Sequence, residues 1–319
     1  MNVVLVTGAT GFIGSEVCRQ LLDRGWRVRA ALRRAFALPT GVESAVVGDI
    51  GADTDWSAAL DGVGAVIHLA ARVHVMHEQA SDPLNEFRRV NVAGTSRLAT
   101  QAAAAGVGRL VFVSSIKVNG ESTDERPPFT ETDPAAPVDP YGISKWEAET
   151  ELLRISAASH LEVAIVRPPL VYGPGVGGNL RRILRAVASG LPLPFASIDN
   201  RRSLIGVWNL ADLLLCALTH PRAAGEIFLA ADGRDLSTPA LIRGLAAGMG
   251  RPARLFPVPQ GLLTALGRWS GRGAEMNRLC GSLEVDAGKA RTLLGWEPPV
   301  AVEDGLRRTA QAILGNGGG

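Results

Sequence analysis

A glycine-rich turn near the amino terminus constrains the fold of this chain more than any other feature. Val3–Thr7 is a short apolar run suited to a buried parallel strand, and Ser15–Arg24 has the pattern of an amphipathic helix. Between them stand Gly8, Gly11 and Gly14. Glycines in this context let the backbone turn tightly and approach a diphosphate, which the helix amino terminus attracts. The order strand, turn, helix therefore predicts a dinucleotide-binding unit, with a ligand-free tight turn as the alternative.

Apolar strand-like runs alternate with helical patterns through the first half of the chain. The strand-like runs are Val3–Thr7, Arg27–Leu32, Ser44–Val47, Ala65–Leu69, Leu110–Ser114 and Glu162–Val166, and the helical patterns are Ser15–Arg24, Ser57–Leu60, Asn85–Ala105 and Tyr141–Ala158. This alternation is typical of a parallel sheet with helices on both faces. It predicts an α/β protein with a Rossmann-type doubly wound parallel sheet. Such sheets bind ligands beyond the carboxyl ends of their strands, so residues just after each strand are the site candidates.

The composition changes at about Pro168, where prolines and glycines become frequent and helical patterns shorter. This change indicates a smaller mixed α/β lobe that covers the ligand edge of the sheet. We therefore expect an NAD(P)-binding domain over residues 1–167 and a substrate lobe over 168–314. Part of 204–231 is expected to return to the first domain, and the glycine-rich 315–319 to be disordered.

Charge and cysteine content exclude several function classes. The chain has 319 residues, of which 20% are charged, and a net charge of +2, which does not favour a nucleic-acid partner or a polyanionic surface. Cys18, Cys216 and Cys280 are odd in number and far apart, which favours apolar fillers in a reducing compartment over a metal site. Neither a signal peptide nor a bilayer-length apolar stretch is apparent. We expect a cytoplasmic protein without membrane insertion.

Tyr141 and Lys145 supply the candidate chemistry. They are four residues apart, so a helix would place both side chains on one face. A phenol titrates at about pH 10, and a nearby fixed positive charge lowers that value. The pair is thus expected to give or take a proton near neutral pH, as general acid–base catalysis requires. Alone the pattern is weak, because such pairs also occur on solvated helix faces.

Further candidates follow the other predicted strands. Ser115 follows Leu110–Ser114, and Asp49-Ile50 follows the third strand, where a carboxylate can accept a hydrogen bond from an adenine amino group. Leu69-Ala70-Ala71 follows the fourth strand, and small residues there let a flat ring or a ribose lie close. Together with the glycine turn and Tyr141, these residues would line one edge of the sheet.

Taken in order, these motifs resemble the extended short-chain dehydrogenase/reductase superfamily, the NAD-dependent epimerases, dehydratases and reductases of nucleotide sugars. The residues that carry the resemblance are Gly8/Gly11/Gly14, Asp49-Ile50, His68-Leu69-Ala70-Ala71, Asn91, Ser114-Ser115, Tyr141/Lys145, Arg167-Pro168 and Leu294-Gly295-Trp296, which span essentially the whole chain. The resemblance implies that Tyr141 is the acid–base residue, that Lys145 holds the nicotinamide ribose and that Ser115 bonds the reacting oxygen. It implies a supporting, structural role for Asn91.

The remaining site residues follow from the same resemblance. Cofactor contacts are expected from Gly8, Gly11, Phe12, Ile13, Gly14, Arg33, Arg34, Asp49, Ile50, Leu69, Ala70, Ala71, Tyr141, Lys145 and Pro168. Substrate contacts are expected from Ser115, from Asn179 at a helix start and from Arg202 on a diphosphate. Phe195 is expected beside a uracil, largely through its backbone, and Arg278 is a weaker candidate for a second arginine. No metal is expected.

The second predicted strand bears on the choice of cofactor. NAD-selective enzymes place an acidic residue roughly 20 positions beyond the glycine turn, where it binds the ribose 2′-hydroxyl. Between Asp23 and Glu43 the chain has no acidic residue, whereas Arg33 and Arg34 end the second strand and could pair with a 2′-phosphate. We favour NADP(H), with NAD(H) as the alternative. The alternative without a cofactor role is that both arginines are solvated at the strand end.

The residues after Ser115 restrict the reaction. Family 4,6-dehydratases carry an Asp-Glu pair there, whereas this chain has Ile116 and Lys117, so a dehydratase is rejected. The segments 114–121 and 168–175 look most like reductases of UDP-linked 4-keto-6-deoxy-N-acetylhexosamines, which supply surface polysaccharide precursors. A UDP-hexose or UDP-N-acetylhexosamine 4-epimerase with retained NAD is the alternative. A non-catalytic nucleotide sensor is disfavoured because both Tyr141 and Lys145 are present. Relatives often dimerise through helices equivalent to 85–105 and 141–158, so a homodimer is possible.

Overall fold

A seven-stranded parallel sheet forms the frame of the protein. The computed structural model describes residues 3–73 and 82–315. In chain order the strands of this sheet are β1 (Val3–Thr7), β2 (Arg27–Leu32), β3 (Val42–Val46), β4 (Val63–His68), β5 (Arg109–Val113), β6 (Glu162–Arg167) and β9 (Ile227–Leu229). Their spatial order is β3-β2-β1-β4-β5-β6-β9, and every neighbouring pair is parallel. The predicted Rossmann-type fold is confirmed.

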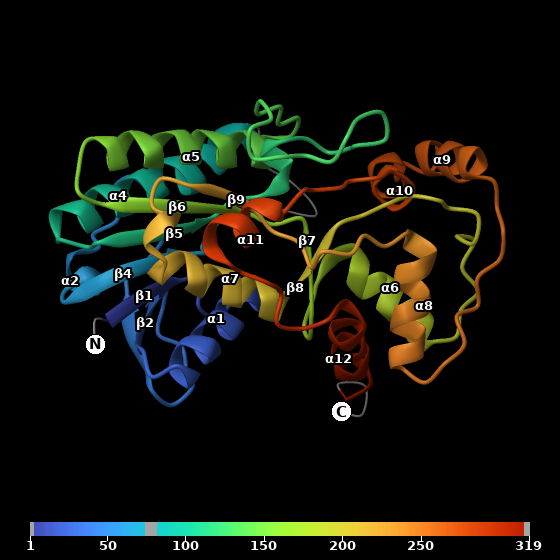
Figure 1. Cartoon of the computed structure of the whole chain (residues 1–319), viewed down its shortest axis with the longest axis horizontal. Helices are drawn as coiled ribbons and strands as arrows, with labels where there is room; N and C mark the ends of the chain where they lie inside the picture. Colours follow the sequence, from blue (N-terminus) through green and yellow to red (C-terminus); the bar gives the residue numbers. More distant parts are fainter. Residues whose placement is uncertain (1–2, 74–81, 316–319) are drawn as a thin grey trace.

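Helices cover both faces of this sheet, as Figure 1 shows. One face packs against α1 (Phe12–Asp23) and α7 (Val207–Thr219), and the other against α2 (Ser57–Leu60), α4 (Gly94–Ala104) and α5 (Pro140–Ala157). Strand β1 shows why both faces need covering. Val4 and Val6 belong to the core on one side, and Val3 and Leu5 to the core on the other, because successive side chains of a strand point to opposite faces.

The predicted helix over 85–105 is interrupted by a wider turn. It comprises α3 (Pro83–Phe87), a π-helical stretch η1 (Arg88–Ala93) and α4. Gly94 follows the π-helical residues and packs so closely on Ile50 that an added Cβ would lie 2.4 Å from that side chain. π-Helical turns are rare and often occur at functional sites. Here the turn carries Asn91, whose side chain supports the site described below.

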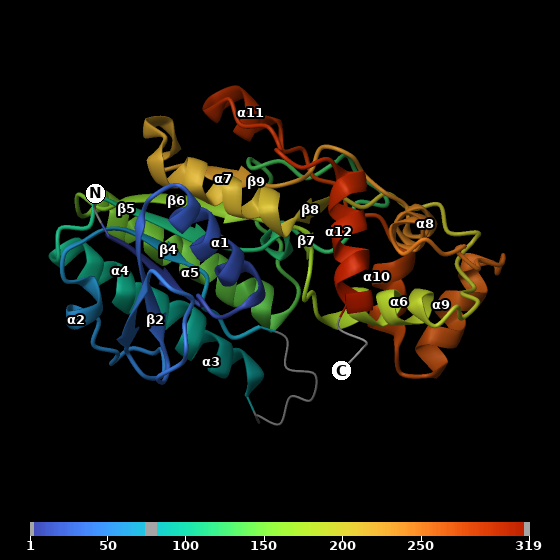
Figure 2. The same cartoon turned by 90° about the horizontal axis from the view of Figure 1, so that it is seen from below.

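The second lobe has its own apolar core and a two-stranded parallel sheet of β7 (Leu170–Tyr172) and β8 (Leu204–Gly206). Its helices are α6 (Gly178–Ala188), α8 (Thr238–Gly248), α9 (Gln260–Trp269), α10 (Gly273–Cys280) and α12 (Val302–Gly315). Figures 1 and 2 show this lobe beside one end of the large sheet. Outside this lobe, short 3-10 turns follow β5 at η2 (Ile116–Val118) and α7 at η3 (Pro221–Ala223).

The chain does not divide cleanly at residue 168. Helix α7 and strand β9, both within 204–231, pack with the first lobe, and β9 pairs with β6. Helix α11 (Gly288–Leu294) and the following Trp296 also pack on that core, which the sequence did not indicate. Gly315, expected to be disordered, is the last residue of α12, and 316–319 lie outside the described residues. Over 3–73 and 82–315, no helix combines the length and apolarity that crossing a bilayer requires.

The glycine turn leaves no room for a side chain at Gly14. A Cβ added there would lie 2.1 Å from the Gly8 carbonyl oxygen, well inside contact distance. We expect Gly14→Ala to destabilise the protein by about 1–3 kcal/mol or more, because overpacking displaces the backbone, and to weaken dinucleotide binding. Urea unfolding and cofactor titration test both effects.

Gly261→Ala is the matched control for this change. Gly261 also lies in a helix, and an added Cβ there meets no atom within 4 Å. Alanine is favoured over glycine in helices by up to about 1 kcal/mol, so this variant should keep or gain stability. Equal behaviour of the two variants would show that the turn at Gly14 relaxes freely.

Candidate active site

The turn after β1 forms a cradle for an anion. Gly8 has φ +68°, in the left-handed region that favours glycine, and the Gly11 N–H donates to the Gly8 carbonyl at 2.9 Å. An added Cβ at Gly8 would lie 3.0 Å from the Ala70 nitrogen. Gly11 caps α1 without a side-chain hydrogen bond, and the first turn of α1 contains no acidic residue. The first N–H groups of α1 therefore suit a diphosphate.

A cleft of about 730 Å³ opens beside this turn, at the carboxyl ends of β1, β2 and β4. Of the predicted cofactor residues, Gly8, Gly11, Arg33, Arg34, Asp49, Ile50, Leu69, Ala70 and Ala71 line it. Thr10, Phe36, Arg72 and Arg89 line it as well, and the sequence did not single them out. These residues meet although up to about eighty positions separate them, because parallel strands end at one edge.

Six residues predicted to contact the cofactor do not line the cleft: Phe12, Ile13, Gly14, Tyr141, Lys145 and Pro168. The first three lie at the start of α1. Gly14 packs against the Gly8 carbonyl, and Ile13 packs on the core of the first lobe. The Phe12 side chain packs against the core of the second lobe, near Gly173. Since Phe12 opens α1, only its backbone N–H is placed for a ligand at the turn. The Phe12 ring instead joins the two lobes at the base of the site.

The cleft is positively charged on its β2 side. Arg33 Nε lies 3.0 Å from Asp49 Oδ1, with both side chains 79% exposed, so this ion pair is weak and open to competition. Arg34, also exposed, forms no ion pair with any residue in 3–73 or 82–315. Four arginines face a single carboxylate in the cleft lining. A nicotinamide dinucleotide fits this donor set, with the diphosphate at the glycine turn and a ribose near Arg33 and Arg34.

The start of α5 holds the acid–base pair. Asp139 caps the helix, its Oδ1 accepting from the Gly142 N–H at 2.7 Å, and Pro140 occupies the first helical position. Tyr141 and Lys145 then follow one turn apart on the helix, as predicted. The Tyr141 phenol forms a hydrogen bond with the Ser115 side chain. The structure thus brings Ser115, at the end of β5, to the Tyr141 hydroxyl.

The pKa of Tyr141 is raised, whereas the sequence predicted that it would be lowered. Burial and the Asp139 carboxylate raise the pKa of Tyr141, and the hydrogen bond from Ser115 opposes them only in part. Lys145 is not among the groups that lower the pKa of the phenol. Sequence spacing placed the two side chains on one helix face but could not reveal the burial. The phenol is therefore a protonated group, suited to donate a proton to a nearby oxygen.

Lys145 is a buried amine directed under the sheet edge. Its side chain is 2% exposed, and Nζ donates to the Val113 carbonyl at 2.7 Å and lies 4.3 Å from the centre of the Phe112 ring. Burial lowers the pKa of Lys145 to about 7, and the Glu149 carboxylate partly opposes this. The amine therefore exchanges protons at neutral pH beside the end of β5.

Two polar networks fix the helix that carries the pair. The Asn91 amide donates to Ser144 Oγ and to the Arg72 carbonyl, both at 3.0 Å, and Ser144 donates to the Tyr141 carbonyl at 2.8 Å. Asn91 thus joins η1 to the segment after β4 through the Arg72 backbone, and to α5 through the Ser144 hydroxyl. Deeper in the fold, the Arg167 guanidinium and the Glu149 carboxylate form a buried ion pair at 2.5 Å. Removing one partner would leave a buried charge, which is strongly destabilising.

A buried histidine beneath the cleft is hydrogen-bonded to two threonines. His68 Nδ1 and Nε2 lie 2.7 Å and 2.9 Å from the hydroxyls of Thr7 and Thr95. The Thr7 hydroxyl in turn accepts from the backbone N–H groups of Leu69 and Ala70, at 3.1 Å and 3.0 Å. Burial lowers the pKa of His68 to about 3, so the ring is neutral and positions the Leu69–Ala71 backbone. The threonines were not predicted; for Thr7, a polar residue that ends an apolar strand was the available signal.

Residues at the end of β6 complete the edge. The Pro168 carbonyl accepts from the Ile116 N–H at 3.0 Å, which holds the turn after Ser115. Within the described part of the chain, the Ser114 hydroxyl is buried without a hydrogen-bond partner. Lys117, which replaces the dehydratase glutamate, forms ion pairs with Asp139 and Glu121. It therefore braces the cap of α5 and is not placed as a free base.

The predicted substrate residues lie in different settings in the second lobe. Asn179 is partly exposed in the first turn of α6. The Phe195 ring belongs to the apolar core of this lobe, so only its backbone can meet a ligand. Arg202 donates to the Gly281 carbonyl at 3.0 Å. Burial and the nearby Arg278 lower the pKa of Arg202, so two guanidinium groups do approach each other there.

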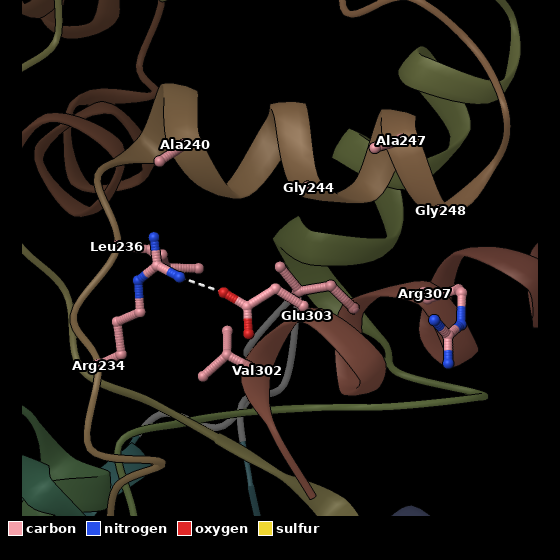
Figure 3. Close-up of a pocket in the computed structure, with 10 residues that line it drawn as sticks. Arg234, Leu236, Ala240, Gly244, Ala247, Gly248, Val302, Glu303 and Arg307 are labelled. Carbon is pink, nitrogen blue, oxygen red and sulfur yellow. Dashed lines mark hydrogen bonds and ion pairs between the residues drawn. The ribbon is translucent and has the colours of Figure 1, made fainter.

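A second hollow of about 360 Å³ lies between α8 and α12 in the second lobe, as Figure 3 shows. Its polar groups are the Arg234–Glu303 ion pair and Arg307, and the rest of its lining is aliphatic or glycine. It holds neither a hydroxyl nor a thiol that could act as nucleophile or proton donor. The chemistry of the chain is at the sheet edge, and we place the candidate active site there.

Known proteins match this chain along nearly its whole length. The NAD dependent epimerase/dehydratase family matches residues 4–231. A UDP-glucose 4-epimerase of Vibrio cholerae is 44% identical over 98% of this chain and 95% of its own length. A short-chain dehydrogenase/reductase superfamily protein of Agrobacterium tumefaciens with bound NAD has a TM-score of 0.75 at 27% identity, covering 98% of both chains. MoeE5 in complex with UDP-glucose and NAD has a TM-score of 0.77 at 26% identity, covering 98% and 99%.

Proposed function

The chain belongs to the NAD dependent epimerase/dehydratase family, and on that basis we propose that it reduces the C4 carbonyl of a UDP-linked 4-keto-6-deoxy-N-acetylhexosamine with NADPH. It is an enzyme of the short-chain dehydrogenase/reductase type, with epimerase- or reductase-type activity on nucleotide sugars and a nicotinamide cofactor. The finer assignment makes its product a precursor of surface polysaccharide.

The observation that carries this assignment is the basic end of β2. Arg33 and Arg34 face the cleft where an NAD-selective enzyme places a carboxylate for the ribose 2′-hydroxyl. A cofactor with a 2′-phosphate is used once and released in reductive chemistry, whereas an epimerase retains its cofactor. Ile116 and Lys117 after Ser115 also disfavour dehydration, since Ile116 has no proton to transfer and Lys117 is held in ion pairs.

The protein's own groups support proton transfer at a sugar C4 oxygen. When bound, the cofactor supplies or accepts the hydride. The Ser115 hydroxyl would donate a hydrogen bond to the carbonyl oxygen, and Tyr141 would donate its proton to that oxygen as the alcohol forms. The tyrosinate left behind takes a proton from water or from Lys145, whose pKa of about 7 suits a relay. Each turnover then restores the protonated phenol.

A 4-epimerase is the second candidate, because the 44% identical relative is a UDP-glucose 4-epimerase and the two solved relatives above hold NAD. In that reaction Tyr141 would first accept the proton of the C4 hydroxyl and later return one to the same oxygen. Burial and Asp139 raise the pKa of the phenol and keep it protonated, which is the form that the reductive direction requires.

One assay separates the two candidates. Purified protein is incubated with UDP-4-keto-6-deoxy-N-acetylglucosamine and NADPH, and the nicotinamide absorbance and sugar products are followed. A reductase consumes one NADPH for each sugar reduced. In parallel, UDP-N-acetylglucosamine and UDP-glucose are incubated without added cofactor. Conversion to the galactose epimers, with no NADPH consumption on the keto sugar, would contradict the reductase proposal and establish the second candidate.

We expect Arg34→Ala to reduce the preference for NADPH. A hydrogen bond to a charged group contributes about 1.5–3 kcal/mol, so KM for NADPH should rise roughly 10- to 100-fold while KM for NADH stays within about twofold. Arg27→Ala is the matched control, because Arg27 lies at the opposite end of β2 and pairs with Glu43. Equal losses with both cofactors would assign Arg34 to the shared part of the dinucleotide and remove the basis for NADP(H).

Further proposals concern the substrate lobe and assembly. The adjacent Arg202 and Arg278 suit the diphosphate of a UDP-sugar. Asn179 and the Phe195 backbone, in the same lobe, are proposed as further substrate contacts. Helix α5 exposes Trp146 and Leu153, at 44% and 36%, which supports a homodimer through this helix. Three free cysteines agree with a reducing cytoplasm. Isothermal titration with UDP tests the diphosphate site, and light scattering tests the homodimer.

A further inference from the structure

Helix α9 presents an apolar face that residues 3–73 and 82–315 leave uncovered. Leu262, Leu266 and Trp269 have exposed fractions of 51%, 50% and 89%. Their spacing of four and three residues places them on one side of the helix. Trp269 is the most exposed of the large hydrophobic side chains in residues 3–73 and 82–315. We refer to these three residues as the α9 face.

The opposite side of α9 explains why this face stays exposed. Leu263 is 4% exposed and belongs to the core of the second lobe. Gly267 packs on α10 so closely that an added Cβ would lie 2.7 Å from Met276 Cβ. Helix α9 is therefore firmly attached by one side. Figures 1 and 2 place α9 at the end of the second lobe farthest from the seven-stranded sheet.

The charge around the α9 face favours one kind of partner. Residues 251–280 contain five arginines and a single acidic residue, Glu275. Glu275 pairs with Arg182, whereas Arg268 and Arg272 are exposed and form no ion pair within the described residues. The net charge of +2 for the whole chain conceals this local excess. Arg268 lies on α9, and Arg272 lies in the turn between α9 and α10. Apolar residues bordered by free arginines are typical of binding to anionic lipid headgroups.

We propose that the α9 face docks the protein on an anionic lipid bilayer, with Trp269 in the headgroup region and Arg268 and Arg272 on lipid phosphates. An indole is amphipathic and suits that boundary. No spanning segment is needed, because a helix lying in the interface buries only its apolar side. The proposal does not depend on the reaction: α9 bears none of the residues assigned to the cofactor or to proton transfer.

Vesicle sedimentation with the full chain tests the docking. Vesicles of equal parts phosphatidylglycerol and phosphatidylcholine should retain the protein, and pure phosphatidylcholine should retain much less. Arg268→Ala with Arg272→Ala should weaken partitioning about 25-fold, since each basic residue near an anionic surface contributes roughly fivefold. Salt at about 1 M, which screens charges beyond roughly 3 Å, should release the protein.

Two further variants distinguish the apolar contribution to vesicle binding from unfolding of the protein. Trp269→Ser should lower partitioning roughly tenfold or more and remove a blue-shifted component from the emission of the six tryptophans. Leu314→Ser, on α12 and 41% exposed, should bind as the unaltered chain does. All variants should keep their melting temperature and their turnover of soluble substrate.

Three outcomes would overturn the proposal. The first is sedimentation that does not depend on phosphatidylglycerol. The second is Trp269→Ser binding as tightly as the unaltered chain. The third is conversion of a dimer to a monomer by Trp269→Ser without any vesicle binding, which would assign the α9 face to a second copy of this chain. None of these outcomes bears on the reductase assay.

Discussion

Tyr141→Phe is expected to lower kcat by roughly 10²–10⁴-fold, because the variant lacks the proton that the C4 oxygen must receive. The phenol is hydrogen-bonded to Ser115, and its ring meets Phe87 edge-on with centroids 6.1 Å apart. Phenylalanine keeps the ring contact and removes only the hydroxyl. Binding of the nucleotide, followed by titration calorimetry, should therefore stay within about threefold. Single-turnover measurements with the keto sugar would locate the loss in the chemical step.

The chain offers a matched control, because it contains only one other tyrosine, Tyr172. Tyr172 is buried in the second lobe, and its hydroxyl donates to Asp232 Oδ2 at 2.6 Å. Tyr172→Phe removes a buried hydrogen bond to a carboxylate, so it should cost about 1–3 kcal/mol of folding free energy and leave kcat nearly unchanged. Tyr141→Phe is thus expected to change mainly the rate, and Tyr172→Phe mainly the stability. An unaltered rate in Tyr141→Phe would remove Tyr141 from the proposed chemistry.

Much of the first lobe could be predicted because its signals are local. The apolar runs that form β1 and β2 begin and end where the sequence indicated. Helix α5 was predicted to within one residue at each end, since Asp139 and Pro140 mark its start. The burial partner of α11 was less accessible. Apolar residues there indicate burial, but nothing local says that they join the core of the first lobe.

At the site, spacing predicted which residues share the sheet edge and missed how tightly they are packed. The glycines, Asp49 and Leu69–Ala71 meet at one cleft, as the strand-end rule requires. Phe12 was assigned to the cofactor, yet its ring completes apolar contacts in the second lobe. The Phe195 ring is also part of that core, and the contact expected of its backbone stays a prediction. The direction of the Tyr141 pKa shift was also wrong. Burial is a property of the whole fold, and no pattern within five residues of helix reveals it.

The buried amine of Lys145 leads to the second large effect. Lys145→Met should reduce kcat by about 10²-fold or more, because the variant loses a proton-exchanging group that lies beneath the end of β5 and donates to the Val113 carbonyl. It should also make the protein more stable at neutral and acidic pH. Replacing a buried charge by an apolar side chain of similar length removes a desolvation cost. Loss of activity together with a gain in stability separates a functional residue from a structural one.

The pH dependence of that gain has a definite sign. The pKa of Lys145 is about 7 in the folded protein and 10.5 in the unfolded chain. Between these values the unfolded chain binds the additional proton, so the stability of the unaltered protein rises with pH across this window. The advantage of Lys145→Met should therefore be largest below pH 7, on the order of 5 kcal/mol, and vanish toward pH 10.5. Urea unfolding of both proteins at several pH values measures this difference. A constant difference, or one that grows with pH, would mean that the amine stays charged in the folded state and would remove it from the proton relay.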